Sequence, residues 1–138
     1  MTSTGLSVRL TNHQEHILET LEKLDTPISA QDLHVKMRST YKSLRLATVY
    51  RGLEVLKFHG LVQSRSLING KFLYSLAKKH QHYFTCLQCS ESIDIQACPV
   101  CQLEAELKQS LSFKVFYHTL EFFGLCYICQ TKDTSKFS

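Results

Sequence analysis

A long hydrophobic run is absent from this sequence of 138 residues. No stretch approaches the roughly 18 apolar residues that a membrane-spanning helix needs, and the first thirty residues contain no apolar run typical of a signal peptide. We therefore expect a protein of the reducing cytoplasm, with no membrane partner. No catalytic constellation is present either, so we expect neither an enzyme nor a small organic substrate.

Cysteine is absent from the first 85 residues and frequent after them. All six cysteines occur in C-x-x-C pairs, which are CLQC at 86–89, CPVC at 98–101 and CYIC at 126–129. In a reducing compartment, paired cysteines bind metal more often than they form disulfides. A tetrahedral zinc site needs four ligands, so two pairs suffice for one ion and a third pair remains.

Charge divides the chain in a similar way. Residues 1–79 contain 12 Lys and Arg against 6 Asp and Glu, whereas residues 80–138 contain 4 against 6. A basic part without cysteine and an acidic part rich in cysteine predict two domains, which we place at 1–77 and 78–138. The basic domain suits a polyanion such as DNA, although a solvated basic surface would account for the charge equally well.

Three short helices are predicted in the basic domain. Thr11 and Gln14 form a capping-box pattern before a run of apolar residues at helical spacing. Ser29 begins the second helix, with Asp32 at the matching position. The third helix covers "RLATVYRGLEVLKFHG" at 45–60. Its buried stripe consists of Leu46, Val49, Leu53 and Leu56.

A β-hairpin follows the third helix. The strands are expected at 62–66 and 71–76, on either side of Asn69-Gly70, which is a strong signal for a tight turn. Three helices followed by a hairpin form a winged helix-turn-helix, in which the third helix enters the major groove of DNA.

Several residues of this domain are candidates for contacts with DNA. Arg51 is the best candidate for a base or a phosphate, because it lies on the exposed face of the third helix. For the two basic residues of the wing, an ordinary surface charge is about as good an explanation. The predicted contacts are Thr48, Tyr50, Arg51 and Lys57 in the helix, and Arg65 and Lys71 in the wing.

The first and last cysteine pairs are expected to form one zinc site. Cys86 and Cys89 follow a predicted strand, and so do Cys126 and Cys129. Two such turns side by side present four thiolates at about 2.3 Å from one zinc ion. The domain is too small for a large core, so a structural metal would add folding free energy.

Between these pairs the sequence predicts one helix and one long strand. The helix begins near Pro99, and Leu103, Leu107 and Leu111 form its core face. The strand covers "FKVFYHTLEFFGLCYIC" from residue 113 to the last cysteine pair.

Several motifs together resemble the ferric uptake regulator family, over the range from Thr11 to Cys129. They are "ISAQDL", "LATVYRGLEVLKFHGLV", H-x-H-x-x-x-C-x-x-C and "YHTLEFFGLCYIC". The resemblance implies an α+β protein with an N-terminal winged helix-turn-helix and a small C-terminal α/β dimerisation domain that holds a four-cysteine structural zinc. It also implies a bacterial, homodimeric repressor that binds double-stranded operator DNA and controls metal-uptake genes. The "HTLEFFG" wording is most similar to the zinc uptake regulators.

The resemblance further implies a sensing site near the hinge. By the spacing of the family, its ligands are His80, His82, Cys101 and His118. A thiolate in place of the carboxylate of many members softens the site and favours zinc over iron as the second metal. Glu104, one helical turn after Cys101, is expected to be a reserve ligand or a hydrogen-bond acceptor for an imidazole.

The role of Cys98 is left open by the sequence. It fits a helix cap, an alternative ligand, or a redox partner of Cys101. One alternative function is therefore a thiol-redox protein that uses Cys98 and Cys101. The other is an iron- or peroxide-sensing regulator of the same family.

Overall fold

The computed structural model describes residues 9–79 and 82–132 of the chain. It divides into two compact units, an N-terminal unit of Met1–Lys79 and a C-terminal unit of His80–Ser138. Among the described residues, no helix is both long and apolar enough to cross a membrane.

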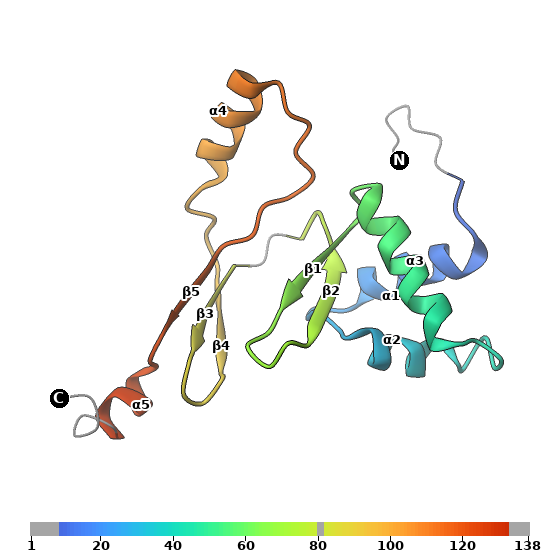
Figure 1. Cartoon of the computed structure of the whole chain (residues 1–138), viewed down its shortest axis with the longest axis horizontal. Helices are drawn as coiled ribbons and strands as arrows, with labels where there is room; N and C mark the ends of the chain where they lie inside the picture. The colour runs from blue at the N-terminus through green and yellow to red at the C-terminus, as the bar shows by residue number, and fades with distance from the viewer. Residues whose placement is uncertain (1–8, 80–81, 133–138) are drawn as a thin grey trace. The chain divides into compact units, whose positions relative to one another are not determined.

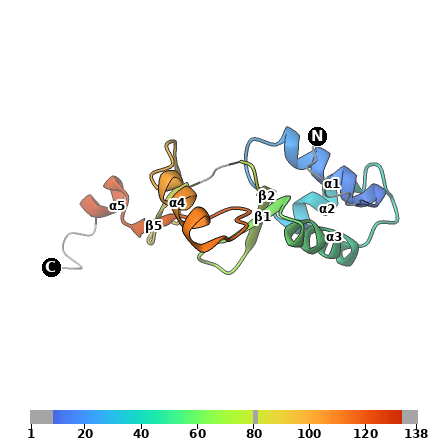
Figure 2. The same cartoon turned by 90° about the horizontal axis from the view of Figure 1, so that it is seen from above.

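Three helices form one side of the N-terminal unit, and they are α1 (Asn12–Lys23), α2 (Ala30–Met37) and α3 (Leu46–Phe58). Figures 1 and 2 show all three on the same side of the hairpin. The predicted caps are present, because the Thr11 side chain accepts from the Gln14 N–H and the Ser29 side chain from the Asp32 N–H. These local hydrogen bonds satisfy orphan N–H groups and set where α1 and α2 begin.

The hairpin consists of β1 (Val62–Ser66) and β2 (Phe72–Leu76), paired antiparallel with Val62 opposite Leu76. The turn contains Gly70 at φ 87°, a left-handed conformation that glycine adopts without steric cost. The predicted Asn69-Gly70 turn is thus confirmed. A short bridge between Ile28 and Tyr74 ties the segment before α2 to the hairpin.

A continuous hydrophobic core fills the N-terminal unit. Val49, Leu53 and Leu56 of α3 are buried as predicted, and Leu46 packs half-buried at the edge. At Gly52 a Cβ atom would lie 2.9 Å from the Ile17 side chain, so glycine allows α1 and α3 to approach closely. The complete core cluster is Ile17, Leu21, Ile28, Ala30, Leu33, Met37, Leu44, Val49, Leu53, Leu56, Val62, Tyr74 and Leu76.

The C-terminal unit contains a three-stranded sheet in the order β4-β3-β5. Strand β3 (His82–Cys86) pairs antiparallel with β4 (Ser92–Ile95) and parallel with β5 (Glu121–Gly124). Two helices complete the unit, α4 (Cys101–Leu111) between β4 and β5, and α5 (Tyr127–Lys132) after β5. A helical N-terminal unit with a hairpin wing and a mixed C-terminal unit confirm the predicted α+β fold class.

The prediction of one long strand from residue 113 is wrong. Only Glu121–Gly124 is a strand, and the last cysteine pair lies at the start of α5. The pairing explains the length, because β5 begins opposite Tyr83 and β3 begins at His82. Among the described residues, β3 offers a pairing partner only as far back as His82, and a strand needs a neighbour that pairs with its backbone.

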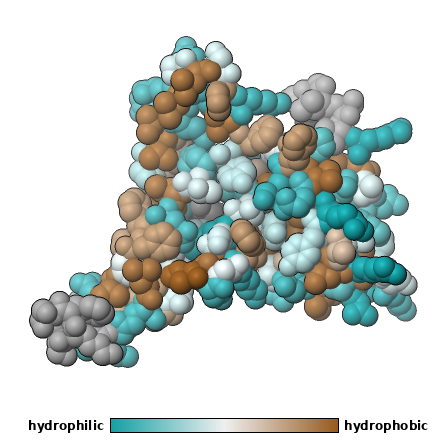
Figure 3. Space-filling view, in the orientation of Figure 1, coloured by the Kyte–Doolittle hydropathy of each residue, from teal (hydrophilic) through white to brown (hydrophobic). Residues whose placement is uncertain are grey.

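The prediction that α4 buries a leucine stripe is also wrong for a single chain. Leu103, Leu107 and Leu111 keep 52%, 46% and 59% of their surface exposed, and α4 contains no buried residue. Figure 1 shows α4 standing apart from the sheet of its own unit, and Figure 3 shows hydrophobic residues along it. The helical spacing of the leucines is present as predicted, but the described residues of this unit provide no surface that buries them.

Candidate metal centres

The four outer cysteines lie at one end of the sheet. Cys86 ends β3 and is paired with Gly124 of the parallel neighbour β5, so both strands lead into their cysteine turns at the same end. The four Sγ atoms of Cys86, Cys89, Cys126 and Cys129 lie within 4.8 Å of one another. We call this group the four-cysteine cluster.

The dimensions of the four-cysteine cluster suit zinc. A tetrahedron with Zn–S bonds of about 2.3 Å has S···S edges of about 3.8 Å. The Cys89 and Cys126 sulfurs are 3.9 Å apart. The N–H groups of Cys89 and Cys129 point at the Cys86 and Cys126 sulfurs, each at 3.5 Å, a pattern that stabilises thiolates.

The thiols of this cluster differ in acidity without a cation. Backbone hydrogen bonds from Cys126 and then Cys89 lower the pKa of Cys86 to about 6. The pKa of Cys129 is raised to about 12, first by its hydrogen bond with the Cys126 side chain and then by burial. One thiolate therefore forms readily, but further negative charge needs a compensating cation, which a divalent metal ion supplies.

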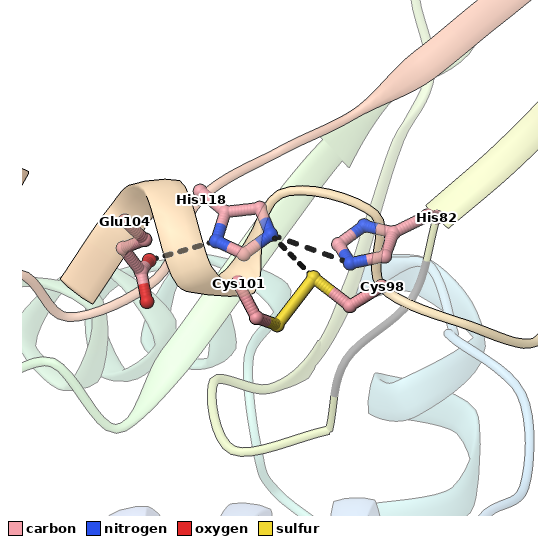
Figure 4. The surroundings of a disulfide bond; sticks show 5 residues. All are labelled: His82, Cys98, Cys101, Glu104 and His118. Carbon is pink, nitrogen blue, oxygen red and sulfur yellow. Dashed lines mark hydrogen bonds and ion pairs between the residues drawn. A yellow bond between two sulfur atoms is a disulfide. The ribbon is translucent and has the colours of Figure 1, made fainter. Parts of the chain in front are cut away.

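A second group of ligand atoms lies elsewhere in the same unit, and Figure 4 shows it. His82 begins β3, His118 precedes β5, and Cys98 precedes α4. The Nε2 atoms of His82 and His118 are 3.3 Å apart, and the Cys98 sulfur is 3.4 Å from Nε2 of His118. We call these three residues the histidine–cysteine cluster.

The histidine–cysteine cluster also has the dimensions of a tetrahedral metal site. Zn–N bonds of about 2.0 Å and a Zn–S bond of about 2.3 Å give N···N edges of about 3.3 Å and N···S edges of about 3.5 Å. The observed distances of 3.3 Å and 3.4 Å are close to these. His82 is only 1% exposed, and two imidazole nitrogens at this distance need a proton or a metal ion between them.

Glu104 of α4 orients one of the two imidazoles. Its carboxylate lies 2.7 Å from Nδ1 of His118. When Nδ1–H donates to this carboxylate, the lone pair of Nε2 is left to face the cluster. The carboxylate contacts the back of a candidate ligand, which is one of the two roles expected for Glu104.

The predicted sensing ligands are distributed differently from the expectation. His82 and His118 meet, and the sulfur beside them is that of Cys98. Cys101, the first residue of α4, is joined to Cys98 by a disulfide bond. His80 lies outside the described residues. The role of Cys101 as a ligand therefore stays a prediction, and the structure adds Cys98 as the sulfur nearest the two imidazoles.

The predicted DNA contacts occupy different parts of the N-terminal unit. Tyr50 and Arg51 are exposed on α3, whereas Thr48 is half-buried near its start. The Lys57 ammonium lies 3.6 Å from the carboxylate of Glu54 on the preceding turn. In the wing, Arg65 of β1 is half-buried and Lys71 before β2 is exposed.

A pocket at the start of α3, lined in part by basic side chains, was not predicted from the sequence. Thr48 lines it together with residues from α1 and from the loop before α3. Basic side chains at a helix N-terminus are suited to a phosphate group, and the positive charges before "LATVYR" were the available signal. The other lining residues are His13, Tyr41, Lys42, Ser43, Leu44 and Arg45.

Known proteins are similar to this chain in sequence and in fold. The family model described as the Ferric uptake regulator family matches residues 5–123. The zinc uptake regulation protein of Mycobacterium tuberculosis is 33% identical over 129 residues, 93% of this chain and 99% of that protein. The peroxide-responsive repressor PerR of Staphylococcus aureus is 25% identical over 125 residues, 91% of this chain and 84% of that protein. The solved ferric uptake regulator of Vibrio cholerae is 28% identical with a TM-score of 0.59, covering 86% of this chain and 92% of that one.

Proposed function

The chain belongs to the ferric uptake regulator family, and we propose that it is a zinc-responsive repressor that binds operator DNA of metal-uptake genes. Members of this family are transcription regulators and not enzymes. The observation that carries the choice of zinc is the sulfur beside His82 and His118, because thiolate and imidazole ligands favour zinc over the harder iron(II) ion.

The two metal centres have separate roles in this proposal. Zinc at the four-cysteine cluster stabilises the C-terminal unit, since its ligands join the ends of β3 and β5. A second zinc at the histidine–cysteine cluster is the sensed ion. Its ligands are His82, His118 and the Cys98 thiolate, and His80 of the family pattern completes four.

The exposed apolar surface supports a homodimer. Large hydrophobic side chains remain uncovered on α4 and on the segment through β5, more than a monomeric unit of this size is expected to leave in water. We propose that the same surface of a second chain covers them. They are Leu103, Leu107, Leu111, Phe113, Phe116, Phe122 and Phe123.

The N-terminal unit supplies the proposed DNA surface. Tyr50 and Arg51 on α3 face the major groove, while Thr48, Lys57, Arg65 and Lys71 contact the backbone or neighbouring bases. Lys42 and Arg45, at the pocket before α3, add phosphate contacts. A repressor of this kind acts in the bacterial cytoplasm, where its DNA is.

Zinc controls DNA binding by a shift of population. The ligands of the histidine–cysteine cluster come from the start of β3, the segment before α4 and the segment before β5. His82 follows the last residue of the N-terminal unit by only three positions, so its ligation restrains the connection to the reading unit. Zinc then favours the arrangement in which both reading units of a dimer fit adjacent grooves.

The proposal is tested by zinc-dependent DNA binding. The zinc-loaded dimer selects duplexes from a randomised pool, and affinity for the selected duplex is then measured against free zinc, iron(II) and manganese(II) at fixed salt. We expect zinc to act at the lowest free concentration. Arg51→Ala should weaken binding by about 1–3 kcal/mol per reading unit with unchanged zinc content. DNA affinity that does not depend on any metal would contradict the proposal.

A relative named as a peroxide-responsive repressor gives the second candidate function. An iron-bound site would favour nitrogen and oxygen ligands, and here a sulfur lies beside both imidazoles. Preferential action of iron(II), followed by loss of DNA binding in peroxide and oxidation of a ligand residue detected by mass spectrometry, would favour that function over zinc sensing.

A further inference from the structure

One sulfur atom of the C-terminal unit lies where it could form either of two bonds that exclude each other, a bond to zinc or a disulfide bond. The Cys98 sulfur lies 3.4 Å from Nε2 of His118 and within the histidine–cysteine cluster. The same atom is bonded to the sulfur of Cys101 (Figure 4). A disulfide sulfur has no negative charge, whereas a zinc ligand must be a thiolate, so the bond to Cys101 and a bond to zinc compete.

We infer that Cys98 and Cys101 form a thiol–disulfide switch that empties the sensing site when a low-molecular-weight disulfide, such as oxidised glutathione, accumulates. Cys98 is the metal-binding cysteine and Cys101 is the resolving cysteine. This inference rests on the proposed function, because it needs zinc at the histidine–cysteine cluster in the reduced protein. It adds a second input, the thiol redox state, to a repressor that responds to zinc.

The reaction is thiol–disulfide exchange in two steps. The Cys98 thiolate attacks one sulfur of oxidised glutathione, and one glutathione thiolate leaves. The Cys101 thiolate then attacks the Cys98 sulfur, which forms the intramolecular bond and releases the second glutathione thiolate. The two cysteines lose two electrons and the glutathione disulfide gains them, while any thiol proton passes to a departing glutathione. Zinc leaves because its sulfur ligand is gone.

The position of the pair favours reaction here over reaction at the four-cysteine cluster. Cys98 and Cys101 are half-buried, and only Pro99 and Val100 separate them, so closure of the ring needs little chain ordering. In the four-cysteine cluster Cys89 is exposed, but each pair contains one buried cysteine, Cys86 at 2% and Cys129 at 6% exposed, so a disulfide within either pair would have to use a buried sulfur. All four of those cysteines are free of disulfides in the structure in which Cys98 and Cys101 are joined.

Linkage makes the inference quantitative. If the disulfide weakens zinc binding at the second site, zinc must oppose formation of the disulfide by the same factor. Each tenfold loss of zinc affinity corresponds to a shift of about 30 mV in the midpoint of this two-electron couple. We expect at least a tenfold loss, because one ligand is removed and the imidazoles remain.

The experiment uses the full chain, loaded with zinc under reducing conditions and dialysed against glutathione buffers of increasing oxidised fraction. Zinc per chain is measured by mass spectrometry of the metal, and the disulfide by alkylation and peptide mapping. The reduced chain should hold two zinc ions, and the oxidised chain one, with a Cys98–Cys101 bond. Reduction in the presence of zinc should restore the second ion.

Two serine variants separate the roles of the cysteines. Reduced Cys101→Ser should hold two zinc ions. In glutathione buffers where the parent has lost one zinc ion, and where reduced glutathione is still in about tenfold excess, Cys101→Ser should keep both. Cys98→Ser should hold one zinc ion even when reduced. Gln102→Ser, an exposed neighbour, is the matched control and should behave as the parent.

The outcomes distinguish this inference from the function on which it rests. A reduced parent chain with one zinc ion overturns both. Two zinc ions that persist when the Cys98–Cys101 bond has formed, or failure of that bond to form at any glutathione ratio, overturn the switch and leave zinc sensing standing. Loss of the second zinc from reduced Cys101→Ser, with retention in Cys98→Ser, overturns the assigned roles.

Discussion

The two units of this chain are stabilised in different ways. Thirteen buried hydrophobic residues form the core of the N-terminal unit. Among the described residues of the C-terminal unit, the buried hydrophobic side chains are Tyr83, Cys86 and Cys129, and two of these are candidate zinc ligands. The N-terminal unit therefore depends on hydrophobic burial, whereas in the proposed function the C-terminal unit is stabilised by a metal ion and a partner surface.

Removal of the structural zinc should give the largest difference between the units. Structural zinc sites contribute on the order of 10–16 kcal/mol of apparent binding free energy in small domains. Cys86→Ser should lose this zinc and unfold the C-terminal unit, while the N-terminal unit stays folded. Hydrogen exchange of the full chain should show protection kept in α1–α3 and lost in β3–β5. Gln88→Ser, between the cysteines of the same pair, is the control, and full zinc content in Cys86→Ser would contradict the comparison.

The second-largest difference between the units should come from truncating one leucine in each of them. Leu53→Ala opens a cavity in a fully buried site and should cost about 2–5 kcal/mol of unfolding free energy. Leu107→Ala, which is 46% exposed in one chain, should leave the fold of its unit intact and weaken the dimer. Chemical denaturation and sedimentation equilibrium measure the two effects. Equal losses of stability with an unchanged dimer would mean that α4 has no partner surface.

Removal of the Glu104 charge beside His118 should have a smaller effect, confined to the affinity for the second metal ion. Glu104→Gln keeps the shape of the side chain but removes the charge that orients and strengthens the imidazole. Zinc affinity at the histidine–cysteine cluster should fall about 10–100-fold, with no change at the four-cysteine cluster. Competition with a chromophoric chelator measures both. Glu106→Gln, exposed on the same helix, should change neither, and an equal effect of the two variants would remove Glu104 from the site.

The smallest expected effect concerns a lysine that caps a helix of the N-terminal unit. The Lys79 ammonium donates to the carbonyl oxygens of Leu21, Glu22 and Leu24, at 2.9, 3.0 and 2.8 Å. These groups lie at the negative end of α1, so Lys79→Met should cost about 1 kcal/mol of unfolding free energy in this unit. Lys78→Met, whose ammonium pairs with the exposed Glu22 carboxylate, should cost less. Equal losses, by thermal denaturation, would show that the cap adds nothing.

Local signals predicted the N-terminal unit well. Thr11 and Ser29 cap helices where the sequence placed them, and Gly70 turns the hairpin. Each of these signals acts between residues at most a few positions apart, so it is present in the sequence. The prediction of a strand at 113–120 failed for the opposite reason. A strand also depends on a pairing neighbour, and that neighbour lies far away in the chain.

The sequence by itself determined the ligand types, the pairing of the cysteines in C-x-x-C units and the apolar spacing of α4. The tertiary structure decided which of these groups meet. Parallel pairing of β3 and β5 brings two cysteine pairs to one end of the sheet. The course of the backbone before α4 places the Cys98 sulfur, and not that of Cys101, beside the two imidazoles. Spacing along the chain determines which residues lie on the same face of a helix or strand. The distances between segments that are far apart in the chain follow only from strand pairing and packing.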